Sequence, residues 1–394
     1  MIPTRRFGRT EIAMPVFTCG GMRYQHSWKD EDPETIPADN QQNLEATVSR
    51  ALELGISHIE TARGYGTSEV QLGRILPGLP RDKMIVQTKV APDGDGEAFR
   101  GTFEKSMANL RLDHVDLLAL HGINNHEILH NVLQPGGPLA AARKIQSEGR
   151  ARFIGFSSHG DCDVISEAIR TGEFDYVNLH WYWVNRSNEE AIRAATAQDM
   201  GVFIISPNDK GGKLYEPPDK LRDLCSPLSP MSFNNLFCLG NPDVHTLSVG
   251  AARPSDFDEH VSSLELLERA GPIVQEISAR LRQAMAESLG ADWEERWQEG
   301  IPKWEKCPGE INVWEILRLW SFARSLDLLS FGKMRYNLLG QADHWFPGKN
   351  ASQFSDEEML EAMSGSPFCE RIPGILREAH TMLFDKPVER LSKS

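Results

Sequence analysis

Short apolar runs alternate with amphipathic stretches over the first two-thirds of the chain. The runs are rich in Val, Ile, Leu or Phe and are apolar on both faces, which is typical of parallel strands covered on both sides. They predict eight strands, at residues 15–21, 57–62, 84–90, 115–121, 152–158, 176–181, 202–207 and 244–250.

The stretches between these runs have the spacing of helices. Residues 41–54 place Leu44, Val48 and Ala51 on one face and end at Gly55, and residues 98–111 have a similar pattern. Eight strands that alternate with helices over about 250 residues predict a (β/α)8 TIM barrel. An open doubly wound sheet has less support, because no G-x-G-x-x-G follows the first strand.

The two ends of the chain differ from this pattern. Residues 1–14 predict a small hairpin ahead of the first strand, with its turn at Gly8-Arg9-Thr10, in a position to cap the barrel floor. From about residue 271 the strand-like runs cease and tryptophan becomes frequent. We therefore expect a barrel over residues 1–270 and an all-helical C-terminal domain over residues 271–394.

Composition excludes several classes of function. The formal net charge of the 394 residues is −14, which disfavours general binding to nucleic acid. No apolar run approaches the roughly 18 residues that cross a bilayer, and the N-terminus lacks the apolar stretch of a secretory signal. Six cysteines without Cys-x-x-Cys spacing indicate neither a zinc ribbon nor a disulfide framework. These features predict a protein of the reducing cytoplasm with no membrane partner.

Four polar residues stand where a barrel builds its active site, at or after the C-terminal ends of the strands. Glu60 and Lys89 interrupt apolar strands two and three, and His121 ends strand four. Charges buried there are costly unless they are paired, so Glu60 and Lys89 are expected to be partners. Tyr65 follows strand two on the same rim, and the combination favours catalysis over a merely structural ion pair.

This group suits one half of a carbonyl reduction. An ammonium near a phenol lowers the pKa of the phenol from its usual value of about 10, so Tyr65 becomes a usable proton donor beside Lys89. His121 can donate a hydrogen bond to the same carbonyl oxygen. No side chain supplies a hydride, so a cofactor must bring it.

Five motifs in this order resemble the aldo-keto reductase superfamily. They lie at residues 55–69, 86–90, 115–121, 154–159 and 249–260. The resemblance implies a (β/α)8 barrel that binds NADPH/NADP in extended form, with Tyr65 as general acid, Lys89 as its activator and His121 orienting the carbonyl. Glu60 stands where the family usually has aspartate, so the geometry around Lys89 is expected to shift.

The resemblance also implies a cofactor site along the rim. Ser157, Ser158 and Asn178 are expected around the nicotinamide carboxamide, and Ile205 takes a position that often holds a stacking ring. Arg253, at a helix start, suits the 2′-phosphate of NADPH. The expected cofactor-binding residues are Gly21, Met22, Arg23, Ser157, Ser158, Asn178, Ser206, Asn208, Lys210, Gly250, Arg253, Glu259 and His260.

The tail resembles a C-terminal ferredoxin-like helical domain that one branch of these reductases carries. Only Cys307 and Cys369 remain of its cysteines, whereas a cubane cluster needs about four thiolates. We therefore expect a degenerate domain with no iron–sulfur cluster, which could cover the barrel mouth or serve as a docking surface for a protein partner.

The sequence predicts NADPH-dependent reduction of the carbonyl of a small aldehyde, ketone or quinone. Three alternatives stay open. A non-enzymatic NADPH-binding redox sensor is consistent with Glu60 and the altered tail, and a Schiff-base role for Lys89 is opposed by the neighbouring carboxylate. A metal-dependent barrel hydrolase would need close ligands, and no metal is expected. Its candidate ligands are His121, His126, His130, His159 and His180.

Overall fold

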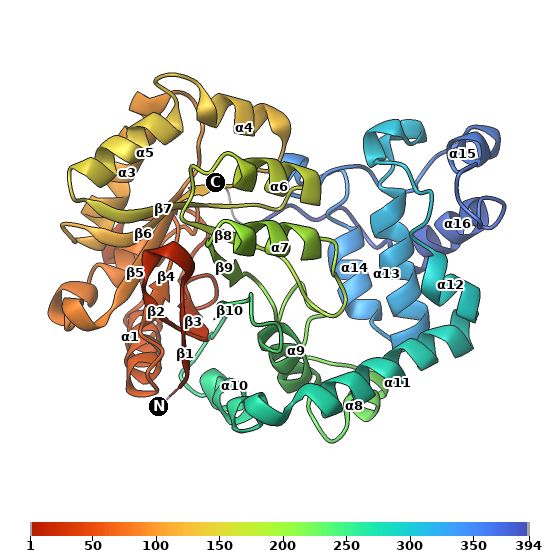
Figure 1. Cartoon of the computed structure of the whole chain (residues 1–394), viewed down its shortest axis with the longest axis horizontal. Helices are drawn as coiled ribbons and strands as arrows, with labels where there is room; N and C mark the ends of the chain where they lie inside the picture. The colour runs from red at the N-terminus through yellow and green to blue at the C-terminus, as the bar shows by residue number, and fades with distance from the viewer. Residues whose placement is uncertain (1, 392–394) are drawn as a thin grey trace. The chain divides into compact units, whose positions relative to one another are not determined.

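Eight parallel strands close into a barrel in the computed structural model, which describes residues 2–391 (Figure 1). The strands are paired in the order β10-β3-β4-β5-β6-β7-β8-β9. Their bounds are β3 Phe17–Gly20, β4 His58–Glu60, β5 Ile85–Val90, β6 Val115–His121, β7 Ala151–Ser157, β8 Tyr176–Leu179, β9 Gly201–Ile204 and β10 Thr246–Val249. The predicted (β/α)8 fold is confirmed, and most strands are shorter than the apolar runs that predicted them.

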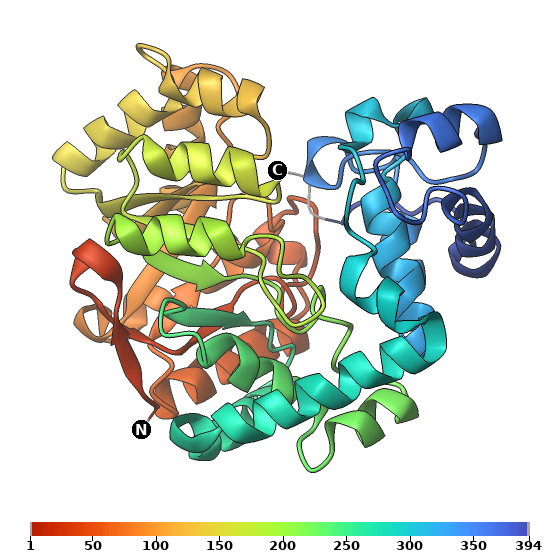
Figure 2. The ribbon, with the colours of Figure 1, turned by 45° about the vertical axis from the view of Figure 1, so that its right-hand side comes forward.

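Helices lie outside these strands, as α3 to α7 do in Figures 1 and 2. The first helix buries Leu44, Val48 and Ala51, the face that its sequence spacing predicts. Asp95 caps the third helix by accepting two backbone N–H bonds. The helices around the barrel are α1 Ala38–Glu53, α2 Ser68–Leu72, α3 Gly96–Leu110, α4 His126–Leu133, α5 Pro138–Ser147, α6 Cys162–Arg170, α7 Glu189–Ala197, α9 Pro230–Leu239 and α10 Asp256–Ser263.

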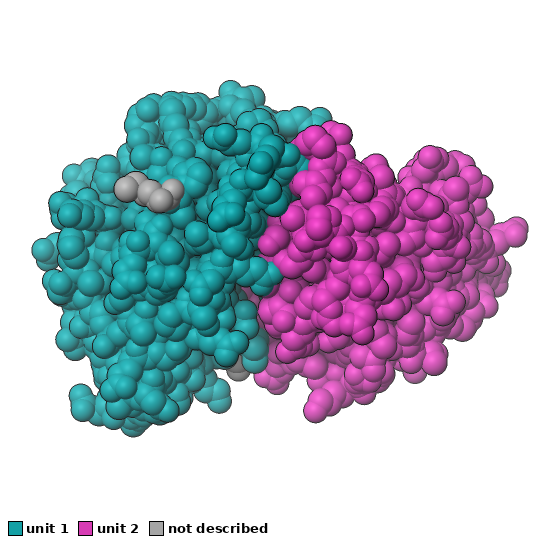
Figure 3. Space-filling view, turned by 90° about the horizontal axis from the view of Figure 1, so that it is seen from below, with its two compact units in different colours: residues 1–211, 234–270, 391–394 teal, residues 212–233, 271–390 magenta. Residues whose placement is uncertain are grey.

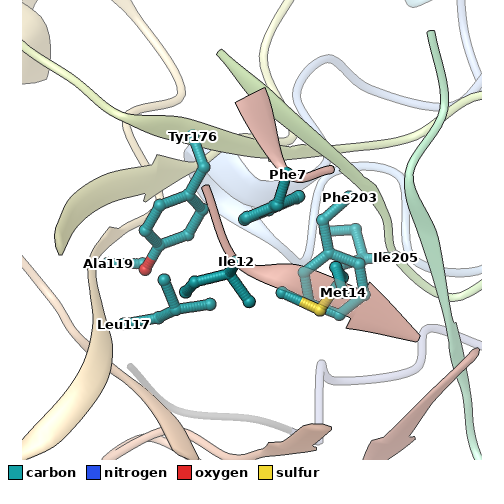
Figure 4. Close-up of a cluster of buried hydrophobic side chains, with 8 residues drawn as sticks. All are labelled: Phe7, Ile12, Met14, Leu117, Ala119, Tyr176, Phe203 and Ile205. Atoms are coloured by element: carbon teal, nitrogen blue, oxygen red, sulfur yellow. The ribbon is translucent and has the colours of Figure 1, made fainter. Parts of the chain in front are cut away.

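The predicted N-terminal hairpin closes the floor of the barrel. Its strands, β1 Thr4–Arg6 and β2 Ala13–Pro15, are antiparallel and joined through a 3-10 turn. Phe7 packs against Tyr176 and His245, at the N-terminal ends of β8 and β10, with ring centroids 5.7 and 5.6 Å apart. The hairpin thereby joins the apolar barrel interior shown in Figure 4, a cluster made of Phe7, Ile12, Met14, Leu117, Ala119, Tyr176, Phe203 and Ile205.

The interior is polar on the side of β3, β4 and β10. Thr18 lies 2.8 Å from His58 Nδ1 and 2.9 Å from the hydroxyl of Thr246, and all three side chains are buried. Burial lowers the pKa of His58 to about 3, so the imidazole is neutral near pH 7. This polar half lies directly below the rim that carries Glu60 and Lys89.

The described chain forms two compact units (Figure 3). The barrel unit contains residues 2–211, 234–270 and 391, and the helical unit contains 212–233 and 271–390. The helices of the second unit are α8 Asp219–Cys225, α11 Gly271–Leu289, α12 Ala291–Arg296, α13 Val313–Leu326, α14 Leu329–Tyr336, α15 Asp356–Ala362 and α16 Ile372–Leu383. The C-terminal region is therefore helical, as expected.

The segment 212–233 joins the helical unit because its side chains and backbone bond there. Arg280 of α11 donates to the carbonyl of Ser226, and Lys213 donates to Ser330 Oγ at 3.0 Å. The pattern of apolar residues in 212–233 does not predict these hydrogen bonds. No helix among residues 2–391 is long and apolar enough to cross a membrane.

Aromatic packing fills the core of the helical unit. Trp293 is fully buried against Trp320 and Phe368, and its indole N–H donates to Ser321 Oγ at 2.9 Å. Burial raises the pKa of the Cys307 thiol to about 11, which disfavours the thiolate that a metal needs.

Candidate active site

Three strand ends bring the predicted polar residues to one rim. Glu60 is the last residue of β4, Lys89 lies next to the end of β5, and His121 is the last residue of β6. The strands are neighbours in the barrel, and Lys89 pairs in register with Ala119, two residues before His121. Because alternate strand residues share a face, His121 points to the same side as Leu117 and Ala119 of the interior.

Glu60 and Lys89 form a buried ion pair. Their side chains are 2% and 1% exposed, and Lys89 Nζ contacts Glu60 Oε1. Lys89 also donates to the carbonyl oxygen of Thr61 at 2.9 Å. Burial lowers the pKa of Lys89 well below its ordinary value, and the adjacent carboxylate opposes that effect by favouring the ammonium.

Tyr65 lies against this pair. Its hydroxyl donates to Glu60 Oε1 at 3.5 Å, and Lys89 Nζ is 4.6 Å from the centre of its ring. The ring of His121 meets that of Tyr65 edge-on, with centroids 5.8 Å apart. The structure thus brings Glu60, Tyr65, Lys89 and His121 together, with the ammonium beside the phenol.

The side chain of Glu60 also has a partner on β10, the strand on the other side of β3. Ser248 on β10 donates to Glu60 Oε2 at 3.3 Å. A Cβ at Gly20 would overlap Ser248 Oγ and lie 3.3 Å from Glu60 Oε2. The sequence reasoning missed both residues, although Ser248 has a detectable signal as a polar residue near the end of an apolar strand.

An aromatic residue from the loop after β3 also reaches the site. Trp28 lies 6.2 Å from Tyr65, ring centre to ring centre. Thr67 fixes this loop, since its N–H donates to Ser27 O at 3.0 Å and its hydroxyl accepts from Ser27 N at 3.1 Å. Gly66 has a φ of +54°, and a Cβ there would overlap Ser27 O. No sequence signal indicated Trp28.

The neighbouring strand ends offer a place for a carboxamide. Ser157 pairs in register with His121 on one side and with Asn178 on the other. Asn178 is fully buried, and neither its amide nitrogen nor its amide oxygen has a partner among the described residues. A primary amide is complementary to another amide, so this residue fits the nicotinamide group of the expected cofactor. Ser158 instead donates into the fold, to Ile123 O at 2.6 Å.

Lys210 lies between two histidines beyond β9. Its Nζ is 3.1 Å from His159 Nδ1 and 3.2 Å from His180 Nε2. Ser206, in the same loop, has a left-handed φ of +53°. Ile205 is buried in the barrel cluster and presents no aromatic ring.

Asn208 and His260 bond to each other inside the fold. Asn208 Nδ2 is 3.2 Å from His260 Nε2, and Asn235 Nδ2 is 2.9 Å from His260 Nδ1. A neutral imidazole accepts only one hydrogen bond, so one of these amides must present its oxygen instead. Burial lowers the pKa of His260 to about 4. These residues therefore connect the loop after β9 to α10 and leave His260 only 2% exposed.

The loops after β3 and β10 meet at the other end of the expected cofactor site. Gly21 N–H donates to Glu60 O at 2.8 Å, Met22 is half-buried, and exposed Arg23 donates to Gly250 O at 3.1 Å. Arg253 and Glu259 are exposed at the start of α10. Eleven of the thirteen predicted cofactor residues lie at strand ends or in the loops that follow them, and Glu259 and His260 lie on α10. Several of their side chains already have hydrogen bonds within the fold, namely those of Arg23, Ser157, Ser158, Asn208, Lys210, Arg253 and His260.

The residues described, 2–391, include no group of three or more His, Cys, Asp or Glu side chains arranged to hold a metal ion. His126 lies with Asp163 and Glu167 on the outer helices, 2.7 Å from the latter. The hydrolase alternative therefore has no metal centre among these residues.

Comparison with known proteins shows that the sequence is similar to reductases and dehydrogenases of one family. The model of the aldo/keto reductase family matches residues 17–273. L-galactose dehydrogenase of Arabidopsis thaliana is 27% identical over 256 residues, which are 57% of this chain and 79% of that protein. An NADH-specific methylglyoxal reductase of Escherichia coli is 27% identical over 188 residues, or 42% of this chain, and the chain spans only 56% of its length.

Solved structures agree on the fold. The holo form of an aldo-keto reductase from Bacillus halodurans has a TM-score of 0.58 at 20% identity and covers 71% of this chain and 96% of its own. An aldo-keto reductase from Klebsiella pneumoniae in complex with NADPH also has a TM-score of 0.58, at 19% identity, and covers 71% of this chain and 95% of its own.

Proposed function

The chain belongs to the aldo/keto reductase family, and from that premise we propose that it reduces the carbonyl of a small aldehyde, ketone or quinone with NADPH. The family supports carbonyl oxidoreductase chemistry in general. The observation that carries the proposal for this chain is the buried Lys89–Glu60 pair against Tyr65.

Tyr65 is the proposed general acid. The Lys89 ammonium favours the phenolate that remains after proton transfer, and Glu60 keeps the lysine charged and oriented. His121 donates a hydrogen bond to the carbonyl oxygen and so polarises it and fixes its position. The Trp28 and Tyr65 rings restrict the space in which that oxygen can lie.

The cofactor, when bound, supplies the hydride. Asn178 and Ser157 are proposed to hold its carboxamide, and Lys210 offers a positive charge for its diphosphate. Arg253 is proposed for the 2′-phosphate, which is the basis for preferring NADPH.

Replacement of the phenol tests this assignment. We expect Tyr65→Phe to lose turnover of aldehydes and quinones in an NADPH-oxidation assay while the Kd for NADPH changes little. Tyr176→Phe is the matched control, because it removes another buried hydroxyl, one with no partner among the described residues, and should retain turnover.

Two other results would overturn the proposal. Unchanged turnover in Tyr65→Phe would show that the acid is a different group. Tight NADPH binding by the wild type, with no turnover on any carbonyl substrate, would instead favour the non-enzymatic sensor.

A further inference from the structure

We propose that Asp256 competes with the 2′-phosphate of NADPH for its binding groups, so that this chain discriminates only weakly between NADPH and NADH. The inference rests on the proposed function, because it takes the start of α10 as the adenosine end of the cofactor site. It adds a specificity-determining residue, and it opposes the contribution expected from Arg253.

The carboxylate of Asp256 already engages two groups that a phosphate at this loop could bind. Its Oδ1 accepts from Arg253 Nε at 3.1 Å, and its Oδ2 accepts from the backbone N–H of Ala252 at 2.8 Å. One donor belongs to the guanidinium, and the other is a backbone N–H in the loop that leads into α10. A 2′-phosphate placed there must displace the carboxylate or share its partners.

The charges around this point add to the conflict. The first turn of α10 contains three acids, Asp256, Asp258 and Glu259. Asp258 is paired with Arg50 of α1 at 3.0 Å, and that arginine also lies 3.6 Å from Glu53. Arg50 and Arg253 therefore each already face a carboxylate. The acids of the first turn also already interact with the positive end of the helix dipole.

Arg23, a third arginine near the start of α10, does not make the local charge positive. Arg23 reaches the carbonyl of Gly250, on the strand side of the same loop. Against Arg23, Arg50 and Arg253 stand the three acids of the helix and Glu53, so the local charge is negative by one.

NADH does not need positive charge at this point, because its adenosine ribose has a 2′-hydroxyl in place of the 2′-phosphate. A carboxylate accepts a hydrogen bond from this hydroxyl, which is how acids favour NAD in dinucleotide sites, whereas an arginine favours the 2′-phosphate. Asp256 and Arg253 are bonded to each other, so the site contains both kinds of recognition group. A single negative charge about 6 Å from a phosphate dianion changes its affinity about tenfold, even at the dielectric constant of water.

Cofactor titration of three proteins tests the proposal. The quench of tryptophan fluorescence gives Kd for NADPH and for NADH with the wild type, Asp256→Asn and Asp258→Asn. Asparagine keeps the shape of the side chain and can still accept from Ala252 N–H. We expect the wild-type Kd values to differ by less than about tenfold, and Asp256→Asn to tighten NADPH by about tenfold with a much smaller change for NADH.

Asp258→Asn is the matched control, since it removes the same charge from the same helical turn but from a carboxylate that faces Arg50. It should shift the NADPH affinity less than Asp256→Asn does. The inference is overturned if Asp256→Asn leaves the ratio of the two Kd values unchanged, or if both variants change it equally. Failure of every protein to bind either nucleotide would instead refute the proposed function.

Discussion

Removing the charge of Glu60 while keeping its shape should make the stability of the barrel depend on pH. Glu60→Gln leaves Lys89 buried without a carboxylate, 1% exposed. Breaking a buried pair by removing one partner costs about 3–5 kcal/mol. A second figure comes from the case in which Lys89 folds in its neutral form. Removing its proton at pH 7, starting from an unfolded-state pKa of about 10.4, costs about 4.6 kcal/mol.

The sign of the pH dependence follows from the direction of the shift. Burial lowers the folded-state pKa of Lys89, and loss of the carboxylate lowers it further. Between that lowered pKa and about 10.4 the unfolded chain binds more protons, so the folded state gains stability as pH rises. Under the proposed role of Glu60, the folded wild type keeps Lys89 charged between pH 7 and pH 9, so only the variant gains stability in this way. The deficit of Glu60→Gln relative to wild type should therefore shrink by up to about 1.4 kcal/mol per pH unit, to about 2 kcal/mol at pH 9.

Urea unfolding at pH 7 and pH 9, followed by hydrogen exchange of peptides from β4 and β5, measures this deficit within the barrel unit. Asp116→Asn is the matched control, because Asp116 is buried on β6 and pairs with Arg81 and Arg152, each at 2.7 Å. Arginine does not lose its proton in this range, so the control deficit should be equal at the two pH values. An equal deficit for Glu60→Gln at pH 7 and pH 9 would refute the reasoning.

Three further predictions concern other parts of the chain. Gly66→Ala should lower turnover strongly and also destabilise the barrel, because Gly66 has a φ of +54° and a Cβ there would overlap Ser27 O, whereas Gly78→Ala, whose Cβ would have nothing within 4 Å, should change neither. Metal analysis should find no iron in the purified protein, since Cys307 and Cys369 are too few for a cluster; stoichiometric iron would contradict this. Acid should destabilise the barrel below about pH 6.5, by up to about 1.4 kcal/mol per pH unit for each buried histidine that must gain a proton on unfolding. Urea midpoints between pH 7 and pH 5 check this, and a flat profile would contradict it for His58, His245 and His260, whose pKa values burial lowers to about 3, 4 and 4.

The barrel and the charged pair on its rim were predictable because both leave local signals in the sequence. Continuous apolar runs mark strands that are covered on both sides, and a charge within such a run must find a partner. Glu60 and Lys89 are therefore recognisable as a pair from sequence. Ser248 and Gly20 were not, since their contact with Glu60 exists only once the first and last strands of the barrel meet.

The loop before α10 shows a different limit of prediction from sequence. Arg253 is visible in the sequence as a cation at a helix start, but its bond to Asp256 depends on side-chain placement within the first turn. Likewise, nothing in the sequence indicated that His260 bonds to two asparagines, one of them 52 residues away along the chain. The sequence shows which side chains can bind a ligand. Only the folded structure shows which of these side chains already bond to another residue.

The hairpin covers the barrel on the side away from Tyr65 and His121. There Phe7, Ile12 and Met14 pack with Leu117, Ala119, Tyr176, Phe203 and Ile205 of the interior. Because such buried clusters pack at close to crystal density, we expect cofactor and carbonyl substrate both to enter and to leave at the opposite side, where the strands end.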